Sequence, residues 1–87
     1  MEAFYPIMLK LAGKKIVVVG GGKVAERKIL GLIDTKANIT VVAPEISLEL
    51  QRLAKTGKID WLDKTFSYED IEGAFMVFAA TNDNKLN

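Results

Sequence analysis

The chain contains short runs of consecutive apolar residues, separated by stretches in which apolar residues recur every third or fourth position. The clearest run, Lys15–Val19 (KIVVV), is rich in β-branched residues and has no polar alternation. Such a run is typical of a parallel strand that is buried on both faces. Asn38–Val42 (NITVV), Ile59–Leu62 (IDWL) and Ala74–Ala79 (AFMVFA, apolar throughout) are predicted as three further strands.

Two segments between these strands have the spacing of amphipathic helices. The first covers residues 23–33, and its apolar positions share one helix face: Val24, Ala25, Ile29 and Leu32 or Ile33. The second follows the second strand, and its apolar positions fall at i, i+4, i+7 and i+8: Ile46, Leu50, Leu53 and Ala54. Pro44 stands where a helix commonly begins and Gly57 where one commonly ends, which predicts the bounds of this second helix.

A single capped turn is predicted before the last strand. Ser67 and Asp70 have the spacing of a capping box, and Gly73 ends the turn. Thr81-Asn82-Asp83 supply polar caps for a helix that the chain barely starts. Strands that alternate with helices predict a parallel sheet with right-handed crossovers. The predicted fold class is therefore α/β, a Rossmann-like doubly wound parallel sheet of about four strands that stops early.

The glycine triplet after the first strand is the main functional motif. Residues 20–25, Gly-Gly-Gly-Lys-Val-Ala, fit the pattern G-x-G-x-x-G/A directly between a predicted strand and a predicted helix. Gly20 allows a sharp turn, Gly22 lets the backbone approach a pyrophosphate, and Ala25 lets the helix pack against the sheet. The N–H groups of the first helical turn then face the phosphates. Glycine triplets also occur in flexible loops without a ligand, but the flanking strand and helix favour nucleotide binding.

A phosphate-loop NTPase is the obvious alternative, because Gly22-Lys23 resembles its GK pair. The match fails at two positions. Val24 stands where a serine or threonine must bind magnesium, and Val17 stands where the leading glycine belongs. The sequence therefore favours a dinucleotide loop.

Glu45 is the candidate acid for a ribose hydroxyl. A dinucleotide site usually has a carboxylate at the end of the second strand, about 20 residues beyond the loop. Glu45 follows Pro44 slightly later than that position. A second interpretation is that Glu45 only stabilises the N-terminal turn of its helix through the helix dipole. No arginine follows the strand closely enough to bind a 2′-phosphate, so NAD is favoured over NADP.

Composition narrows the chemistry further. The 87 residues carry a formal net charge of +1 and include no cysteine and no histidine. A net charge this small provides no electrostatic attraction for nucleic acid or an anionic membrane. The absence of cysteine and histidine excludes disulfides and catalysis by Cys–His or Ser–His pairs. The acidic residues around Glu69 and Asp70 lack a ligand spacing, so no metal site is predicted. We find neither a signal peptide nor a membrane span in the sequence and expect the cytoplasm.

Several stretches together resemble the precorrin-2 dehydrogenase family, the NAD-dependent part of siroheme synthase, over essentially the whole chain. They are Tyr5-Pro6-Ile7 with Leu9 and Leu11, then GKKIVVVGGGKVAERK, ITVVAPE and GAFMVFAATNDNKLN. The resemblance implies oxidation of precorrin-2 to sirohydrochlorin with NAD as cofactor. Some members of the family also act as sirohydrochlorin ferrochelatases. A homodimer is implied for the longer parent protein.

The resemblance also indicates cofactor contacts. Beside the glycines Gly20, Gly21 and Gly22, it assigns NAD contacts to Lys23 and Val24 in the loop and to Pro44 and Glu45 after the second strand. Ala80 and Thr81 would lie beside the nicotinamide end. The Lys23 side chain is expected to point to solvent, so that its backbone N–H matters more than its charge.

The sequence departs from the family pattern at two places. Lys36 occupies the position after the first helix where the family commonly has glycine. The family's acid–base aspartate lies beyond a further strand, past Asn87, so no catalytic residue is assigned here. We therefore interpret residues 1–87 as the NAD-binding domain of a longer enzyme, without its dimerisation and C-terminal regions. Two alternatives are a non-catalytic domain that senses NAD(H) and a domain of an unrelated dehydrogenase.

Overall fold

A computed structural model describes residues 10–80 of the chain. The predicted contact of Thr81 and the predicted helix caps at residues 81–83 lie outside the described residues, as do the motif residues before Lys10.

The described residues form one parallel sheet whose four strands lie in the order β3-β2-β1-β4. The strands are β1 (Lys15–Val19), β2 (Asn38–Val42), β3 (Asp60–Leu62) and β4 (Met76–Ala79). β1 is central and pairs with β2 on one side and with β4 on the other. The predicted α/β class, the parallel sheet and the strand positions are confirmed, with β3 one residue and β4 two residues shorter than predicted.

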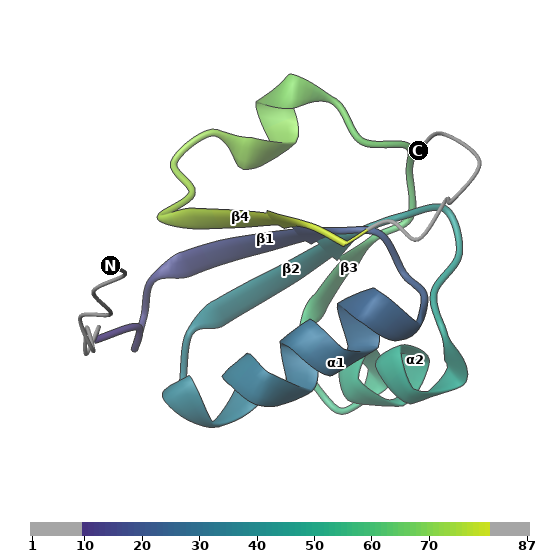
Figure 1. The fold of residues 1–87 in the computed structure, drawn as a ribbon, viewed down its shortest axis with the longest axis horizontal. Helices are drawn as coiled ribbons and strands as arrows, with labels where there is room; N and C mark the ends of the chain where they lie inside the picture. The colour runs from purple at the N-terminus through teal and green to yellow at the C-terminus, as the bar shows by residue number, and fades with distance from the viewer. Residues whose placement is uncertain (1–9, 81–87) are drawn as a thin grey trace, which may run out of the picture.

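Two helices cover one face of the sheet (Figure 1). α1 (Lys23–Leu32) connects β1 to β2 and continues into the short 3₁₀ helix η1 (Ile33–Thr35), while α2 (Leu48–Lys55) connects β2 to β3. The next connection returns across the sheet to place β4 beside β1, and its 3₁₀ helix η2 (Tyr68–Ile71) lies on the opposite face. Right-handed crossovers require this arrangement, because a crossover in the reverse direction passes over the other face.

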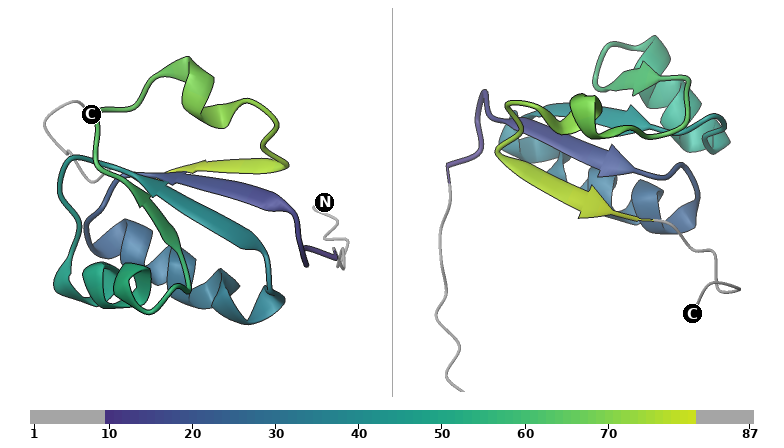
Figure 2. Two further views of the ribbon diagram at one scale, coloured as in Figure 1. Left: turned by 180° about the vertical axis from the view of Figure 1, so that it is seen from behind. Right: turned by 90° about the horizontal axis from the view of Figure 1, so that it is seen from above.

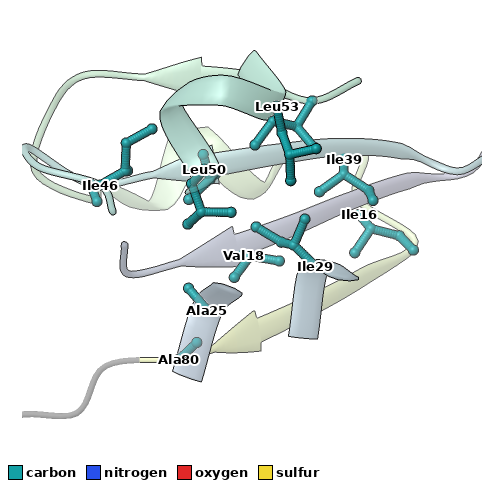
Figure 3. Close-up of a cluster of buried hydrophobic side chains, with 12 residues drawn as sticks. Ile16, Val18, Ala25, Ile29, Ile39, Ile46, Leu50, Leu53 and Ala80 are labelled. Atoms are coloured by element: carbon teal, nitrogen blue, oxygen red, sulfur yellow. The ribbon is translucent and has the colours of Figure 1, made fainter. Parts of the chain in front are cut away.

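The core lies between the sheet and the two helices (Figure 3). Ile16 and Val18 of β1 meet Ile29 of α1 and Leu50 of α2, and all four side chains are fully buried. Val17 points to the other face and is also fully buried, as the unbroken apolar run of β1 predicted. This packing fixes both helices against the sheet and thereby fixes the loops at its carboxyl edge.

The opposite face is covered only in part among the described residues. Phe75 is 48% exposed and Val77 is 44% exposed, although the AFMVFA run predicted a strand that is apolar throughout. Met76 and Phe78, which alternate with them, pack against the core. β4 is thus the edge strand of the described sheet and is buried mainly on its helix-covered face.

The start of α2 differs from the prediction. Pro44 lies in a bend, and the helix begins at Leu48 with Ser47 as its N-cap. The Ser47 hydroxyl accepts a hydrogen bond from the N–H of Leu50 at 3.3 Å, which satisfies one of the unpaired amides of the first turn. The helix ends as predicted before Gly57, whose φ of +81° favours glycine.

Lys36, which occupies the position where the family commonly has glycine, adopts the left-handed conformation, with φ 64° and ψ 24°. It is the only non-glycine residue with positive φ among residues 10–80. Its carbonyl oxygen accepts a hydrogen bond from the N–H of Gly13 at 3.0 Å. This contact with a distant part of the chain holds Lys36 in the left-handed conformation.

We expect Lys36→Gly to stabilise the protein by up to about 1 kcal/mol, because glycine removes the strain of a Cβ in the left-handed conformation. The higher entropy of glycine in the unfolded chain offsets part of this gain. Urea unfolding measures the effect. Lys36→Ala is the matched control, since it removes the charge and keeps the Cβ. An equal gain from alanine would show that charge rather than backbone strain is responsible.

η2 is held by the predicted capping box. Asp70 accepts hydrogen bonds from the Lys64 ammonium group and from the main-chain N–H of Ser67, the latter at 2.8 Å. The pKa of Asp70 lies below its ordinary value of 3.8. The main cause is the hydrogen bond from Lys64, and the second is the hydrogen bond from the N–H of Ser67. A lowered carboxyl pKa stabilises the folded state above the unfolded pKa, and this contribution disappears as the pH falls through the folded pKa.

We therefore expect the difference in unfolding free energy between the wild type and Asp70→Asn to shrink as the pH falls from about 5 to 3. Thermal unfolding across this pH range measures it. Lys64→Met removes the ammonium group that lowers the pKa of Asp70, so the unfolding free energy of this variant should depend less on pH than that of the wild type. A difference that stays constant with pH would contradict an ionic role for Asp70.

Candidate functional site

The candidate site lies at the carboxyl edge of the sheet, where three loops meet. The glycine triplet leaves β1, residues 43–47 leave β2, and Ala80 follows β4. The arrows of β1 and β4 point to this same edge (Figure 2). The strand order reverses between β1 and β4, and in open α/β sheets ligands bind at such a switch point.

Gly20 makes the turn away from β1. Its φ is +119°, a conformation that side chains rarely allow, and its N–H donates to the carbonyl of Val42 at 3.0 Å. The predicted role of Gly20 as the residue of the sharp turn is consistent with this backbone. The turn brings the next residues across the end of β1 toward the end of β2.

Gly22 is the N-cap of α1 and has an extended backbone, with φ −95° and ψ −153°. It provides no side-chain cap for the helix. Within residues 10–80, no main-chain carbonyl accepts from the N–H of Lys23, Val24 or Ala25. These amides, together with the positive end of the helix dipole, favour an anionic group at this position.

The residues of the first turn of α1 differ in exposure. Lys23 is exposed, as predicted, while Ala25 is fully buried against the sheet. Val24 is half-buried and packs against the edge of the core. The first turn thus contributes main-chain donors more than side-chain chemistry.

Glu45 lies next to the glycine loop at the end of β2. Pro44 and Glu45 are exposed, whereas the flanking Ala43 and Ile46 are buried. The carboxylate of Glu45 forms no ion pair with any residue of the described range 10–80. The helix-dipole interpretation required Glu45 to lie in the first turn of α2, but the acid in that turn is Glu49. Glu45 lies two residues before the N-cap Ser47, outside the first turn.

Ala80 lies directly after β4 beside the end of β1. Its N–H donates to the carbonyl of Val19 at 2.8 Å, and its side chain is buried in the core. Ala80 as a whole is only 2% exposed, and its N–H is already hydrogen-bonded. Thr81, predicted beside it, lies outside the described residues.

Sequence reasoning missed two features of this site. It did not identify Ser47, which caps α2 and donates its N–H to the carbonyl of Gly21 at 2.8 Å. A serine just before the apolar spacing of α2 was the available signal. It also gave Gly21 no structural role, although the main chain of residues 45–46 packs directly against it.

The residues present fit a dinucleotide. The unpaired amides of α1 provide donors for a diphosphate, and Glu45 provides an acceptor without an ionic partner in the described chain. The part of the chain from 10 to 80 contains no group of three or more side chains suited to a metal ion. In the same part, every helix is too short or too polar to span a membrane.

The parallel sheet, its strand order and the glycine-rich turn at the switch point define a Rossmann-like α/β domain. The chain belongs to the NAD_binding_7 family, described as "Putative NAD(P)-binding", whose model matches residues 7–87.

Curated relatives match nearly the whole chain. It is 44% identical over 84 residues to siroheme synthase 3 of Aeromonas hydrophila and 45% identical over 84 residues to siroheme synthase of Neisseria meningitidis serogroup C. Each alignment covers 97% of this chain and 18% of the relative. The chain therefore spans about a fifth of the length of these relatives.

A solved structure has the same fold. It is SirC, precorrin-2 dehydrogenase, with a TM-score of 0.87 and 39% sequence identity. The match covers 97% of this chain and 42% of that chain. The resemblance stated from the sequence motifs is confirmed by these relatives, and the fold and a nicotinamide cofactor are supported.

Proposed function

We propose that residues 1–87 form the NAD-binding domain of a longer precorrin-2 dehydrogenase. The observation that carries this proposal is the uncapped first turn of α1, whose amides follow a glycine loop at the switch point of the sheet. The names of the siroheme synthase and precorrin-2 dehydrogenase relatives support the substrate. NAD, when bound, supplies the acceptor for the hydride that precorrin-2 loses on oxidation to sirohydrochlorin.

The residues of this chain bind and orient the cofactor. Gly20 and Gly22 shape the loop, and the amides of Lys23 and Val24 donate to the diphosphate. Glu45 accepts from a ribose hydroxyl, with Pro44 beside it. The nicotinamide end is assigned to Ala80 and Thr81 on the strength of the family resemblance. Lys23 binds phosphate through its main-chain N–H, so its side chain is free to be exposed to solvent.

Glu45 supports NAD rather than NADP as the cofactor. A carboxylate accepts from the 2′-hydroxyl of NAD but repels the 2′-phosphate of NADP. Titration with each reduced cofactor, followed by nicotinamide fluorescence, tests the preference. Tighter binding of NADPH would contradict it.

Turnover by the complete protein tests the reaction. Precorrin-2 and NAD are supplied, and NADH formation is followed by absorbance, with NADP in a parallel assay. We expect NADH to form only when precorrin-2 is present. Tight NAD binding without turnover would instead favour the sensor alternative. Turnover by a protein that is monomeric in solution would contradict only the homodimer implied for the parent.

A further inference from the structure

Gly21 is the middle glycine of the loop, and the dinucleotide pattern places no requirement on its position. In the structure this position is closed to a side chain. A Cβ on Gly21 would overlap the carbonyl oxygen of Glu45 and would lie 2.7 Å from Cγ2 and 2.8 Å from Cα of Ile46. Two of these three atoms belong to the main chain. A methyl group at Gly21 would therefore displace the backbone of residues 45–46.

Hydrogen bonds hold the same two loops together. The carbonyl of Gly21 accepts from the N–H of Ser47 at 2.8 Å, and the N–H of Gly20 donates to the carbonyl of Val42 at 3.0 Å. One bond lies before Glu45 in the chain and the other lies after it. The glycine loop thus anchors both ends of the connection between β2 and α2.

Contacts from the other side complete the support of this connection. The indole N–H of Trp61 donates to the carbonyl of Ala43 at 2.8 Å, and the amide of Gln51 donates to the carbonyl of Ile46 at 3.0 Å. The residues that remain exposed between these anchors are Pro44 and Glu45. The main chain that carries Glu45 is therefore held against Gly21.

We propose that Gly21 is a positioning residue that sets the preference for NAD(H) over NADP(H). Because Gly21 has no side chain, the main chain of Glu45 lies against the glycine loop, and the carboxylate reaches the 2′-hydroxyl of the adenosine ribose. A 2′-phosphate would meet the same carboxylate and be repelled. This inference rests on the proposed binding of NAD at the loop, and it adds a specificity role for Gly21.

The first test compares NADH and NADPH binding to the wild type, Gly21→Ala, Glu45→Ala and the double variant. We expect Gly21→Ala to weaken NADH binding by about tenfold or more, as for loss of a hydrogen bond to a charged group, and to weaken NADPH binding less. The ratio of the two dissociation constants should fall to that of Glu45→Ala. The double variant should have the same ratio as Glu45→Ala alone, because both changes remove one contact.

A second pair of variants leaves Gly21 unchanged. Ser47 has φ −64°, which proline can adopt, so Ser47→Pro removes the N–H that binds the Gly21 carbonyl. Ser47→Ala is the matched control, since both substitutions remove the hydroxyl that caps α2 but alanine keeps the N–H. We expect Ser47→Pro to lose the NADH preference and Ser47→Ala to retain it.

Circular dichroism establishes that each variant is folded. Wild-type selectivity in folded Gly21→Ala would overturn the positioning role, and if that variant does not fold, wild-type selectivity in Ser47→Pro would do the same. A wild type that prefers NADPH would also overturn the inference, while leaving nicotinamide binding intact. A wild type that binds neither cofactor would overturn the proposed function as well.

Discussion

Gly22→Val should abolish measurable NAD binding while the helix content of the protein remains close to that of the wild type. Gly22 has φ −95° and ψ −153°, an extended backbone with negative φ, so glycine is not required here by a left-handed conformation. The branched side chain would, however, stand beside the first-turn amides of α1, where the diphosphate approaches. We expect a loss of affinity on the order of 100-fold or more, equivalent to about 2.7 kcal/mol of binding free energy.

Isothermal titration measures the binding of NAD, and circular dichroism measures the helix content. Gly31→Val is the matched control, because Gly31 lies in the last turn of α1 and is exposed, and an added Cβ would meet no heavy atom within 4 Å outside the neighbouring backbone of its own helix. The control should bind NAD as the wild type does. Unchanged affinity in folded Gly22→Val would contradict binding of the diphosphate at this loop.

Leu50→Ala should produce the largest loss of stability, about 3 kcal/mol in the free energy of unfolding. Leu50 is 0% exposed and lies in the core between α2 and the sheet. Its removal leaves a cavity that the neighbouring strands can fill only in part. A domain of this size has a small margin of stability, so the variant should be largely unfolded at moderate urea concentrations.

Leu48→Ala makes the same chemical change two residues earlier on α2. Leu48 is 81% exposed, so its truncation should alter the unfolding free energy by less than about 0.5 kcal/mol. Urea unfolding of the two variants measures the difference directly. Equal losses in the two variants would show that α2 does not pack on the sheet through Leu50.

The local elements were predictable because their signals are short-range. The run Lys15–Val19 forms β1 with the predicted bounds, and the helical spacing after Gly22 forms α1. Lys36 adopts positive φ where the resemblance places a glycine. In each case, the residue types themselves restrict the backbone, through β-branching, helical spacing or the position of the chain reversal.

The bounds of α2 were not predictable in the same way. Pro44 and Ser47 are both acceptable at a helix start, and the prediction selected the proline. The structure selects Ser47, whose N–H is bound by the Gly21 carbonyl and whose hydroxyl caps the helix. The first of these contacts comes from a loop that precedes Ser47 by more than 20 positions in the sequence, so no local pattern contains it.

Burial was also decided by the neighbours of each strand. Val17 and Val77 are adjacent in the sheet and point to the same face, yet Val17 is fully buried and Val77 is substantially exposed. β1 has a strand on each side, whereas β4 lies at the edge of the described sheet. Two aromatic residues show the same dependence on their neighbours. Trp61 on β3 packs against the core, whereas Tyr68 on η2 is exposed.

The sequence by itself determined the strands, the first helix, the glycine-rich turn and the likeness to precorrin-2 dehydrogenases, because each is specified by residues that are close together in the chain. Only the tertiary structure decided that Gly21 must lack a side chain and that Glu45 lies outside the first turn of α2. The physical reason is the parallel sheet: pairing of β1 with β2 brings their carboxyl ends together, so that two loops distant in sequence must share one small space.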